Sequence, residues 1–332
     1  MLITHQHPLN KSIAIGVIGV PNAGKSSLIN HYMGQDLCIV ADKPQTTRNQ
    51  FQCVFNAGRT EVIMTDTPGL HRHAEELNRR MNEEVRDGTE RAQLVLVLID
   101  TSRDVLTQFK EIATTHARPL NRAWVVFTKS DLFGNVKKEV FADIFEAAKT
   151  FIPSLERYFV TSVMNSQGTV ELLDAIIAAA PSAPHRYEGE SISNKSERFF
   201  AAEYIREQAF LQLRDEVPYE LAVVIDDFQD FLEQEDRGST LENAPEIRKI
   251  SLTATLLVNR QGQRAIVVGT QGSVIKEIGT KARVRIEALT GAKVFLNLHV
   301  KVSPKWFRSN RVLQEIGLDR ASDSTRVWRA KS

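Results

Sequence analysis

The sequence is poor in cysteine and in long apolar runs. Of its 332 residues only two are cysteines, Cys38 and Cys53. Two thiols allow one disulfide at most, and their spacing is not that of a metal site. We therefore expect a protein of the reducing cytosol without a zinc site. The longest apolar run, Leu94 to Ile99, is far too short to cross a bilayer, and residues 1–10 lack the apolar core of a signal peptide. We therefore expect a soluble, cytoplasmic protein.

Net charge is also nearly absent, at +1, but the charge is distributed unevenly. Residues 185–245 hold 15 acidic and 6 basic residues, a net −9, whereas residues 246–332 hold 17 basic and 6 acidic residues, a net +11. This asymmetry favours a polyanionic partner for the C-terminal segment, although a solvated surface is the alternative on charge alone. The length of the chain indicates two domains.

The most informative stretch is Gly19-Val20-Pro21-Asn22-Ala23-Gly24-Lys25-Ser26, which fits G-x-x-x-x-G-K-[ST]. An apolar strand is predicted before it, over 13–18, and a helix after it, from Ser27, which is the setting that a phosphate-binding loop needs. In such a P-loop the backbone N–H groups point at phosphate oxygens, Lys25 reaches the β- and γ-phosphates, and Ser26 ligates Mg²⁺. The alternative is an ordinary glycine-rich turn.

A second motif, Asp66-Thr67-Pro68-Gly69, follows a strand predicted over 61–65. Asp66 would hold the metal through water, and the Gly69 N–H would contact the γ-phosphate. Alone this sequence is a common turn, but after a P-loop it specifically indicates a Mg²⁺-nucleotide site. We expect the charged stretch up to Glu90 to form a helical second switch.

The loop over 41–48 is polar, is interrupted by Pro44 and lacks periodicity. A loop one helix after a P-loop is the place for a nucleotide switch. Thr47 would put its hydroxyl on Mg²⁺ and its N–H on the γ-phosphate, so that the loop orders only when this phosphate is present. On its own a Thr-Thr pair indicates no more than a loop.

Further buried strands are predicted over 94–99, 123–127 and 158–161, alternating with helical stretches. This alternation predicts an α/β fold, a mostly parallel sheet with helices on both faces and ligands outside the carboxyl ends of the strands. Thr128-Lys129-Ser130-Asp131 and Ser162 stand at two of these ends.

In this order and spacing, G-x-x-x-x-G-K-S, D-T-P-G and T-K-S-D resemble the G domain of small GTP-binding proteins. The resemblance implies that Asp131 accepts hydrogen bonds from the guanine ring N–H and amino group, while the Lys129 stem packs along the base. Thr128 replaces the usual Asn, so the bracing of the base loop is expected to be slightly weaker. Ser162 with Val163 is similar to the Ser-Ala loop near guanine O6, and the Val is a departure.

Leu70 stands where Ras-like proteins place the glutamine that positions the attacking water, which implies slow intrinsic hydrolysis. In related GTPases without that glutamine, an asparagine at the position of Asn22 binds a K⁺ ion that replaces an arginine finger. A simple turn-forming role is the alternative for Asn22. The expected catalytic residues are Lys25, Thr47 and Asn22, with Mg²⁺ as cofactor and K⁺ as a second cation if Asn22 is a ligand.

The second half begins after a linker over 183–196, which contains Pro, Gly and Ser and lacks apolar periodicity. A helix is predicted over 199–216, followed by strands over 221–225 and 250–258. The acidic segment 226–246 between these strands is interpreted as a solvated loop.

Two helical pieces joined by Gly269-Thr270-Gln271-Gly272 come next, followed by a strand over 293–302. A G-x-x-G turn between helices lets the backbone clamp about four nucleotides in a KH domain. The order helix, strand, strand, helix, G-x-x-G, helix, strand is that of an α+β type II KH domain. The expected RNA-binding residues are Arg264, Gly269, Thr270, Gln271, Gly272, Lys276, Lys281 and Arg283.

The two halves together resemble the Era family of bacterial ribosome-assembly GTPases over roughly residues 12–306, including Val217-Pro218-Tyr219, Ile275 to Gly279 and Trp306. The expected boundaries are a G domain over 1–182, the linker, a KH domain over 197–306 and an extension over 307–332. Era proteins often carry a Lys inside G-x-x-G, and Thr270 and Gln271 depart from this.

The resemblance implies a GTP-hydrolysing switch that binds GTP and GDP, binds the 3′ end of 16S rRNA and acts in maturation of the 30S subunit. It also implies possible peripheral contact with the cytoplasmic face of the inner membrane, and no DNA partner. Two alternatives stay open. One is a nucleotide-gated RNA-binding adaptor with incidental turnover, and the other is a related GTPase acting on tRNA or the large subunit.

Overall fold

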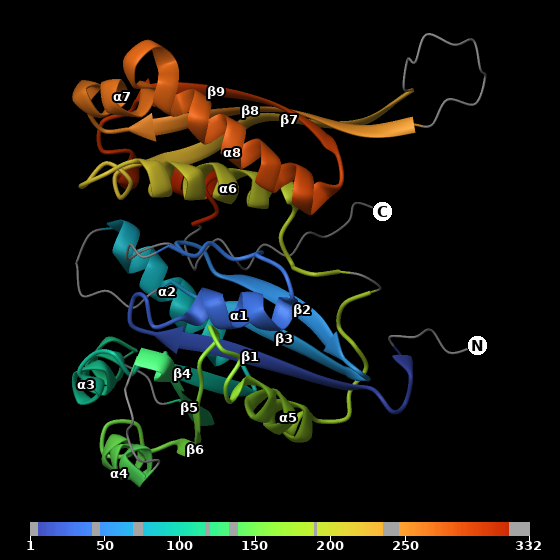
Figure 1. Ribbon diagram of the computed structural model, residues 1–332, viewed down its shortest axis with the longest axis vertical. Coiled ribbons are helices and arrows are strands. Elements are labelled where there is room, and N and C mark those ends of the chain that lie inside the picture. Colours follow the sequence, from blue (N-terminus) through green and yellow to red (C-terminus); the bar gives the residue numbers. More distant parts are fainter. Residues whose placement is uncertain are drawn as a thin grey trace. The chain divides into compact units, whose positions relative to one another are not determined.

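The computed structural model of the chain (Figure 1) describes residues 6–41, 47–68, 76–116, 120–132, 139–188, 191–234 and 246–318. The chain divides into two compact units, residues 1–194 and 195–332. Within the described ranges, none of the helices combines the length and the apolar composition that a membrane span requires. Each unit is described separately below.

The first unit is built on a six-stranded sheet in the order β2-β3-β1-β4-β5-β6. Its strands are β1 (Lys11–Gly19), β2 (Phe51–Ala57), β3 (Thr60–Asp66), β4 (Leu94–Asp100), β5 (Ala123–Thr128) and β6 (Leu155–Val160). All neighbours run parallel except β2, which is antiparallel to β3. Every residue of β3, β4 and β5 is buried, as expected for strands covered on both faces.

Helices form a layer on each side of this sheet (Figure 1). In one layer α1 (Lys25–Met33) is joined to α5 (Thr169–Ala179), since the Tyr32 hydroxyl donates to the Thr169 carbonyl at 2.8 Å. In the other layer α2 (Glu76–Glu90), α3 (Val105–His116) and α4 (Glu139–Ala148) contact one another in sequence. The predicted α/β fold with a mostly parallel sheet is confirmed.

The parallel strands bring their carboxyl ends to one edge of the sheet. Gly19, Asp66, Asp100 and Thr128 are the last residues of β1, β3, β4 and β5. The sequence motifs on these strands therefore meet at this edge, although they are far apart in the chain.

The segment predicted as a linker is attached to the first unit over most of its length. The Glu61 side chain, in the buried strand β3, accepts hydrogen bonds from the backbone N–H groups of Arg186 and Tyr187, both at 2.9 Å. Further along, Val54 N–H donates to the Ile192 carbonyl at 2.9 Å. The backbone of the linker thus satisfies a buried carboxylate that would otherwise be costly.

The second unit has the order α6 (Glu197–Gln212), β7 (Ala222–Gln234), β8 (Glu246–Val258), α7 (Gln261–Val268), α8 (Ser273–Thr290), β9 (Lys293–Val302). Short helices follow at Trp306–Arg308 and α9 (Asn310–Glu315). The sheet order is β7-β8-β9, with β8 antiparallel to β7 and parallel to β9. The predicted type II KH order is confirmed. The helix predicted over 199–216 ends earlier, because the backbone turns extended at Leu213 and buries that side chain.

The prediction of a solvated acidic loop over 226–246 is wrong in its described part. Residues 226–234 continue β7 and pair with β8 as far as Glu246. The acidic side chains have partners on the neighbouring strand: Arg248 bonds Asp230 at 2.6 Å, and Lys249 bonds Glu233. Opposite charges across a strand pair stabilise it, so the acidic composition does not prevent a strand here.

Candidate nucleotide site and RNA-binding groove

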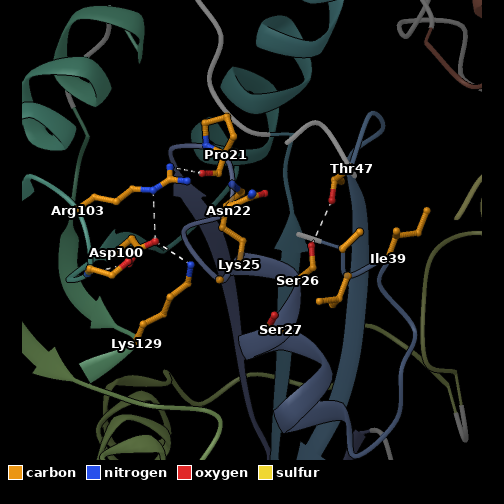
Figure 2. Close-up of a pocket in the computed structure, with 14 residues that line it drawn as sticks. Pro21, Asn22, Lys25, Ser26, Ser27, Ile39, Thr47, Asp100, Arg103 and Lys129 are labelled. Carbon is orange, nitrogen blue, oxygen red and sulfur yellow. Dashed lines mark hydrogen bonds and ion pairs between the residues drawn. The ribbon is translucent and has the colours of Figure 1, made fainter. Parts of the chain in front are cut away.

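A cavity of about 310 Å³ opens at the carboxyl edge of the first unit's sheet. Figure 2 shows the P-loop with Asp100, Arg103 and Lys129 on one side of it and Thr47 on the other, beside Ser26. The backbone of the P-loop is left-handed at Asn22 (φ 64°) and at Gly24 (φ 89°), directly before α1 begins at Lys25. A left-handed conformation favours glycine and is tolerated by asparagine, which explains both residue types in this loop.

Lys25 is buried beneath this loop. Its Nζ donates to the carbonyls of Gly19 at 3.1 Å and Val20 at 3.2 Å. Burial lowers the pKa of Lys25 to about 8, against the opposing attraction of Asp66. A buried ammonium that donates to loop carbonyls gains a strong partner when a phosphate enters the cavity.

Three oxygen-bearing side chains converge beside Lys25. Oδ2 of Asp66 accepts from the Ser26 hydroxyl at 3.0 Å and from the Thr47 hydroxyl at 3.1 Å, and these hydroxyls lie 3.2 Å apart. The structure therefore brings together the three residues that the sequence predicts as metal ligands, from the P-loop, the switch loop and the end of β3.

The second carboxylate oxygen shows what this cluster fits. Oδ1 of Asp66 is buried and has no hydrogen-bond partner among the described residues. Burial raises the pKa of Asp66, while Lys25, the two hydroxyls and the nearby Cys38 thiol act in the opposite direction. An orphaned carboxylate oxygen beside two hydroxyls is an all-oxygen donor set, which is the type that Mg²⁺ prefers.

The segment predicted to read the base is joined to the P-loop. The Thr128 hydroxyl lies 2.8 Å from the carbonyl of Ala23, so Thr128 braces the P-loop even though it replaces an asparagine. The Ser162 hydroxyl donates to Oδ1 of Asp131 at 2.5 Å, and Ser130 N–H donates to the Thr161 carbonyl at 3.1 Å. The two predicted guanine-binding loops therefore lie side by side.

Some predicted residues have other placements. The Thr67 hydroxyl donates to the Val17 carbonyl at 2.5 Å, and Pro68 is buried beside it. Val163 is half-buried next to Ser162. Gly69 and Leu70 lie outside the described residues, so their predicted contacts with γ-phosphate and water stay predictions.

The cavity also has lining residues that the sequence motifs do not include: Ile39, Val40, Ala41, Asp100, Ser102 and Arg103. Asp100 ends β4, between β1 and β5 in the sheet. Its place at a strand's carboxyl end is the sequence signal that could have identified it.

In the second unit the G-x-x-G turn is exposed and left-handed. Gly269 has φ 73° and Gly272 has φ 78°, and Thr270 and Gln271 between them are exposed. A Cβ at Gly269 would lie 2.8 Å from the backbone nitrogen of Val274, so only glycine allows this tight entry into α8.

A groove of about 580 Å³ lies between α8 and the strands β8 and β9. Arg283 and Thr280 line it, and Lys276 shares their side of α8 because successive residues turn by about 100°. Lys281 is roughly 140° away from Lys276 by the same spacing and forms an ion pair with Glu277 at 2.7 Å. The predicted RNA-binding cations on α8 thus divide between two faces of the helix, and Arg264 is exposed on α7.

Family comparisons match both units. Residues 14–129 match the family described as "50S ribosome-binding GTPase", and residues 216–307 match the family described as "KH domain". GTPase Era of Geobacter metallireducens is 35% identical over 91% of this chain and 96% of its own length. GTPase Era of Thermotoga maritima is 33% identical over 93% of this chain and 97% of its own length.

Two solved structures are similar over both units. A crystal structure of Era in complex with MgGDPNP and nucleotides 1506–1542 of 16S ribosomal RNA has a TM-score of 0.80 and 28% identity, and covers 94% of this chain and 100% of its own. A variant of Aquifex aeolicus Era bound to GDP·AlF4⁻ also has a TM-score of 0.80 and 28% identity, covering 93% and 100%.

Proposed function

Because the chain belongs to the Era family of GTPases, we propose that it is a GTP-hydrolysing switch that binds the 3′ end of 16S rRNA and acts in assembly of the small ribosomal subunit. The observation that carries the enzymatic part is the convergence of Ser26, Thr47 and Asp66 beside Lys25. These residues come from three separate segments and meet where a nucleotide's phosphates would enter.

In this proposal the residues of the chain bind and orient the triphosphate. Lys25 moves its ammonium from the loop carbonyls to the β- and γ-phosphates, and Thr47 joins the switch loop to the γ-phosphate. Ser26, Thr47 and Asp66 would hold Mg²⁺, which withdraws charge from the phosphate oxygens when bound. Loss of the γ-phosphate removes a partner of Thr47, so the loop around Thr47 is the nucleotide-sensitive element.

Asn22 is the proposed ligand for a second, monovalent cation. Its left-handed backbone places it on the cavity side of the P-loop, where it lines the nucleotide cavity. A K⁺ ion there would neutralise charge that develops on the phosphates during hydrolysis. This assignment is separate from the Mg²⁺ cluster and is tested separately below.

The RNA part of the proposal places a single strand over the Gly269 to Gly272 turn and along the groove beside Arg283. The exposed turn lets an RNA backbone approach, and Lys276 and Arg283 supply positive charge on the same side of α8. The similar Era structure with a 16S rRNA segment supports this choice of RNA. Assembly of the 30S subunit, a cytoplasmic location and peripheral contact with the inner membrane are proposed from family membership alone.

A competing function, action on the large subunit, is suggested by the description of the G-domain family. The KH unit favours the small subunit, because a solved structure that resembles both units is that of Era with a 16S rRNA segment.

Binding of the full chain to labelled RNA distinguishes these functions. We expect the unpaired 3′ end of 16S rRNA to bind more tightly than a scrambled RNA or a 23S rRNA fragment of equal length, and more tightly with GDPNP than with GDP. Equal binding of all three RNAs would refute the assignment to the small subunit. GTP turnover at the level of a Lys25→Ala variant would refute the enzymatic part.

A further inference from the structure

A buried carboxylate connects the two halves of the nucleotide site. The Asp100 side chain is 0% exposed and lies between two cations (Figure 2). Its Oδ2 is 2.7 Å from Nζ of Lys129 and 3.7 Å from Nε of Arg103, while its Oδ1 accepts from the N–H of Ser102 at 2.9 Å and from its hydroxyl at 2.6 Å. Burial opposes ionisation, but the hydrogen bonds from Lys129 and Ser102 outweigh it and the pKa of Asp100 lies below its ordinary value.

Arg103 extends from this carboxylate to the phosphate side. Its Nη1 donates to the carbonyl of Pro21 at 3.2 Å. The next residue, Asn22, is left-handed at φ 64°. A donor on the Pro21 carbonyl fixes the peptide plane that enters this uncommon conformation.

Lys129 connects the same carboxylate to the base side. It is itself left-handed at φ 57° and belongs to the T-K-S-D segment that would read guanine. The ion pair with Asp100 holds its side chain in one direction before a base arrives, so less conformational freedom is lost on binding.

We propose that Asp100 and Arg103 are positioning residues of the GTPase site: Asp100 orients Lys129 and Arg103, and Arg103 fixes the Pro21–Asn22 peptide against the phosphates. The inference rests on the proposed GTP hydrolysis and adds two residues to it. Base recognition and phosphate positioning are then linked through one carboxylate, rather than set by independent loops.

The alternative is that the ion pair between Arg103 and Asp100 has no functional effect. Arg103 is 50% exposed, and ion pairs of such groups contribute little to stability. The two alternatives therefore predict different effects of a substitution at Arg103. If the ion pair has no function, GTP turnover does not change, whereas loss of a positioning residue lowers turnover and leaves folding unchanged.

The first test is the substitution Arg103→Gln in the full chain. We expect kcat for GTP to fall on the order of tenfold, because small misplacements of catalytic groups are costly, with KM within about twofold since Arg103 does not face the base. Arg103→Lys should recover part of kcat. The matched control is Arg122→Gln, which breaks an exposed ion pair with Glu156 at the start of β6, and it should keep the wild-type kcat.

The second test measures coupling with Lys129. Arg103→Gln, Lys129→Ala and the double variant form a cycle on kcat/KM, and groups that share Asp100 should give a clearly non-additive result. Wild-type kcat in Arg103→Gln, a loss of kcat that parallels a loss of thermal stability, or an additive cycle would each overturn the inference. In each of these outcomes the wild-type chain still hydrolyses GTP, whereas failure of the wild type itself would refute the proposed function.

Discussion

The Ser162 hydroxyl is hydrogen-bonded to Oδ1 of Asp131 at 2.5 Å. Asp131 is exposed, whereas Ser162 is buried at the end of the neighbouring strand β6. A buried hydroxyl thus orients an exposed carboxylate. This relationship makes the direction of the Asp131 side chain depend on two loops at once, and in the proposed function the choice of base would depend on both loops as well.

Asp131→Asn should exchange guanine preference for xanthine preference. The amide can donate to the additional xanthine oxygen, whereas it no longer accepts both guanine donors. Competition of XTP and GTP for the variant measures this. The control Asp143→Asn removes a carboxylate from the exposed side of α4 and should keep GTP preference. Unchanged GTP affinity with no gain for XTP would remove Asp131 from the site.

Asp66→Asn should abolish Mg²⁺-dependent turnover. The substitution removes the charge next to Ser26 and Thr47, and loss of a charged interaction of this kind costs about 1.5–3 kcal/mol or more. Titration of GTPase activity with Mg²⁺ measures the effect, and Thr47→Ser, which keeps the hydroxyl, serves as the conservative control. A wild-type Mg²⁺ dependence in Asp66→Asn would contradict the metal assignment.

The wild-type chain should hydrolyse GTP faster in K⁺ than in Na⁺. Asn22→Gly should remove this difference, because glycine keeps the left-handed backbone of Asn22 and deletes only the amide. Turnover rates at matched ionic strength compare the two salts. If the wild type is indifferent to the cation, Asn22 is no more than a turn former.

GDP affinity should fall as the pH rises above about 8, the pKa to which burial lowers Lys25. Phosphate favours the protonated amine and raises its pKa in the complex, so binding above pH 8 requires proton uptake and weakens by up to about tenfold per pH unit. Below pH 8 the amine is already protonated and this effect disappears. Calorimetry at pH 9 in two buffers of different ionisation enthalpy measures the proton uptake. The same observed binding heat in both buffers would mean that no proton is taken up and would contradict the prediction.

Arg283→Ala should weaken RNA binding more than Lys281→Ala. Arg283 lines the groove, whereas Lys281 lies on another face of α8 in an ion pair with Glu277. A lost phosphate contact weakens all RNA sequences similarly and reduces the salt dependence. Binding at two salt concentrations tests both variants. Equal losses would place the RNA across both faces of α8.

Substitution of Thr270 and Gln271 by Asp should also weaken RNA binding, by charge repulsion at the clamping turn. Both side chains are exposed, so the variant should fold normally. Circular dichroism controls for folding, and RNA affinity unchanged by the two added carboxylates would move the RNA away from G-x-x-G.

The fold was accessible from the sequence because its strands carry local signals. The strands β1, β3, β4 and β5 each contain a short apolar run, and β1, β3 and β5 lead directly into a sequence motif, so a parallel sheet brings these motifs together. The cluster of Ser26, Thr47 and Asp66 could be predicted for the same reason. Helical spacing alone would also have separated Lys281 from Arg283, but the sequence interpretation grouped the two by charge.

Other features depend on partners that no local pattern identifies. The acidic stretch after Ile225 becomes a strand because Arg248 and Lys249 lie diagonally across from Asp230 and Glu233 on the neighbouring strand and pair with them. Likewise, the Arg103 side chain reaches Pro21 only because the fold places the loop between β4 and α3 beside the P-loop, as their hydrogen bond shows. Such contacts arise from tertiary packing and override composition.

The attachment of the linker to the first unit restricts the conformational freedom of residues 183–196. Gln52 N–H donates to the Asn194 side chain at 2.8 Å, and α6 begins at Glu197. Gln52 lies in β2, the strand that follows the loop of Thr47. The hydrogen bonds that Arg186, Tyr187, Ile192 and Asn194 make to the first unit therefore remove conformational freedom that a linker flexible throughout would keep.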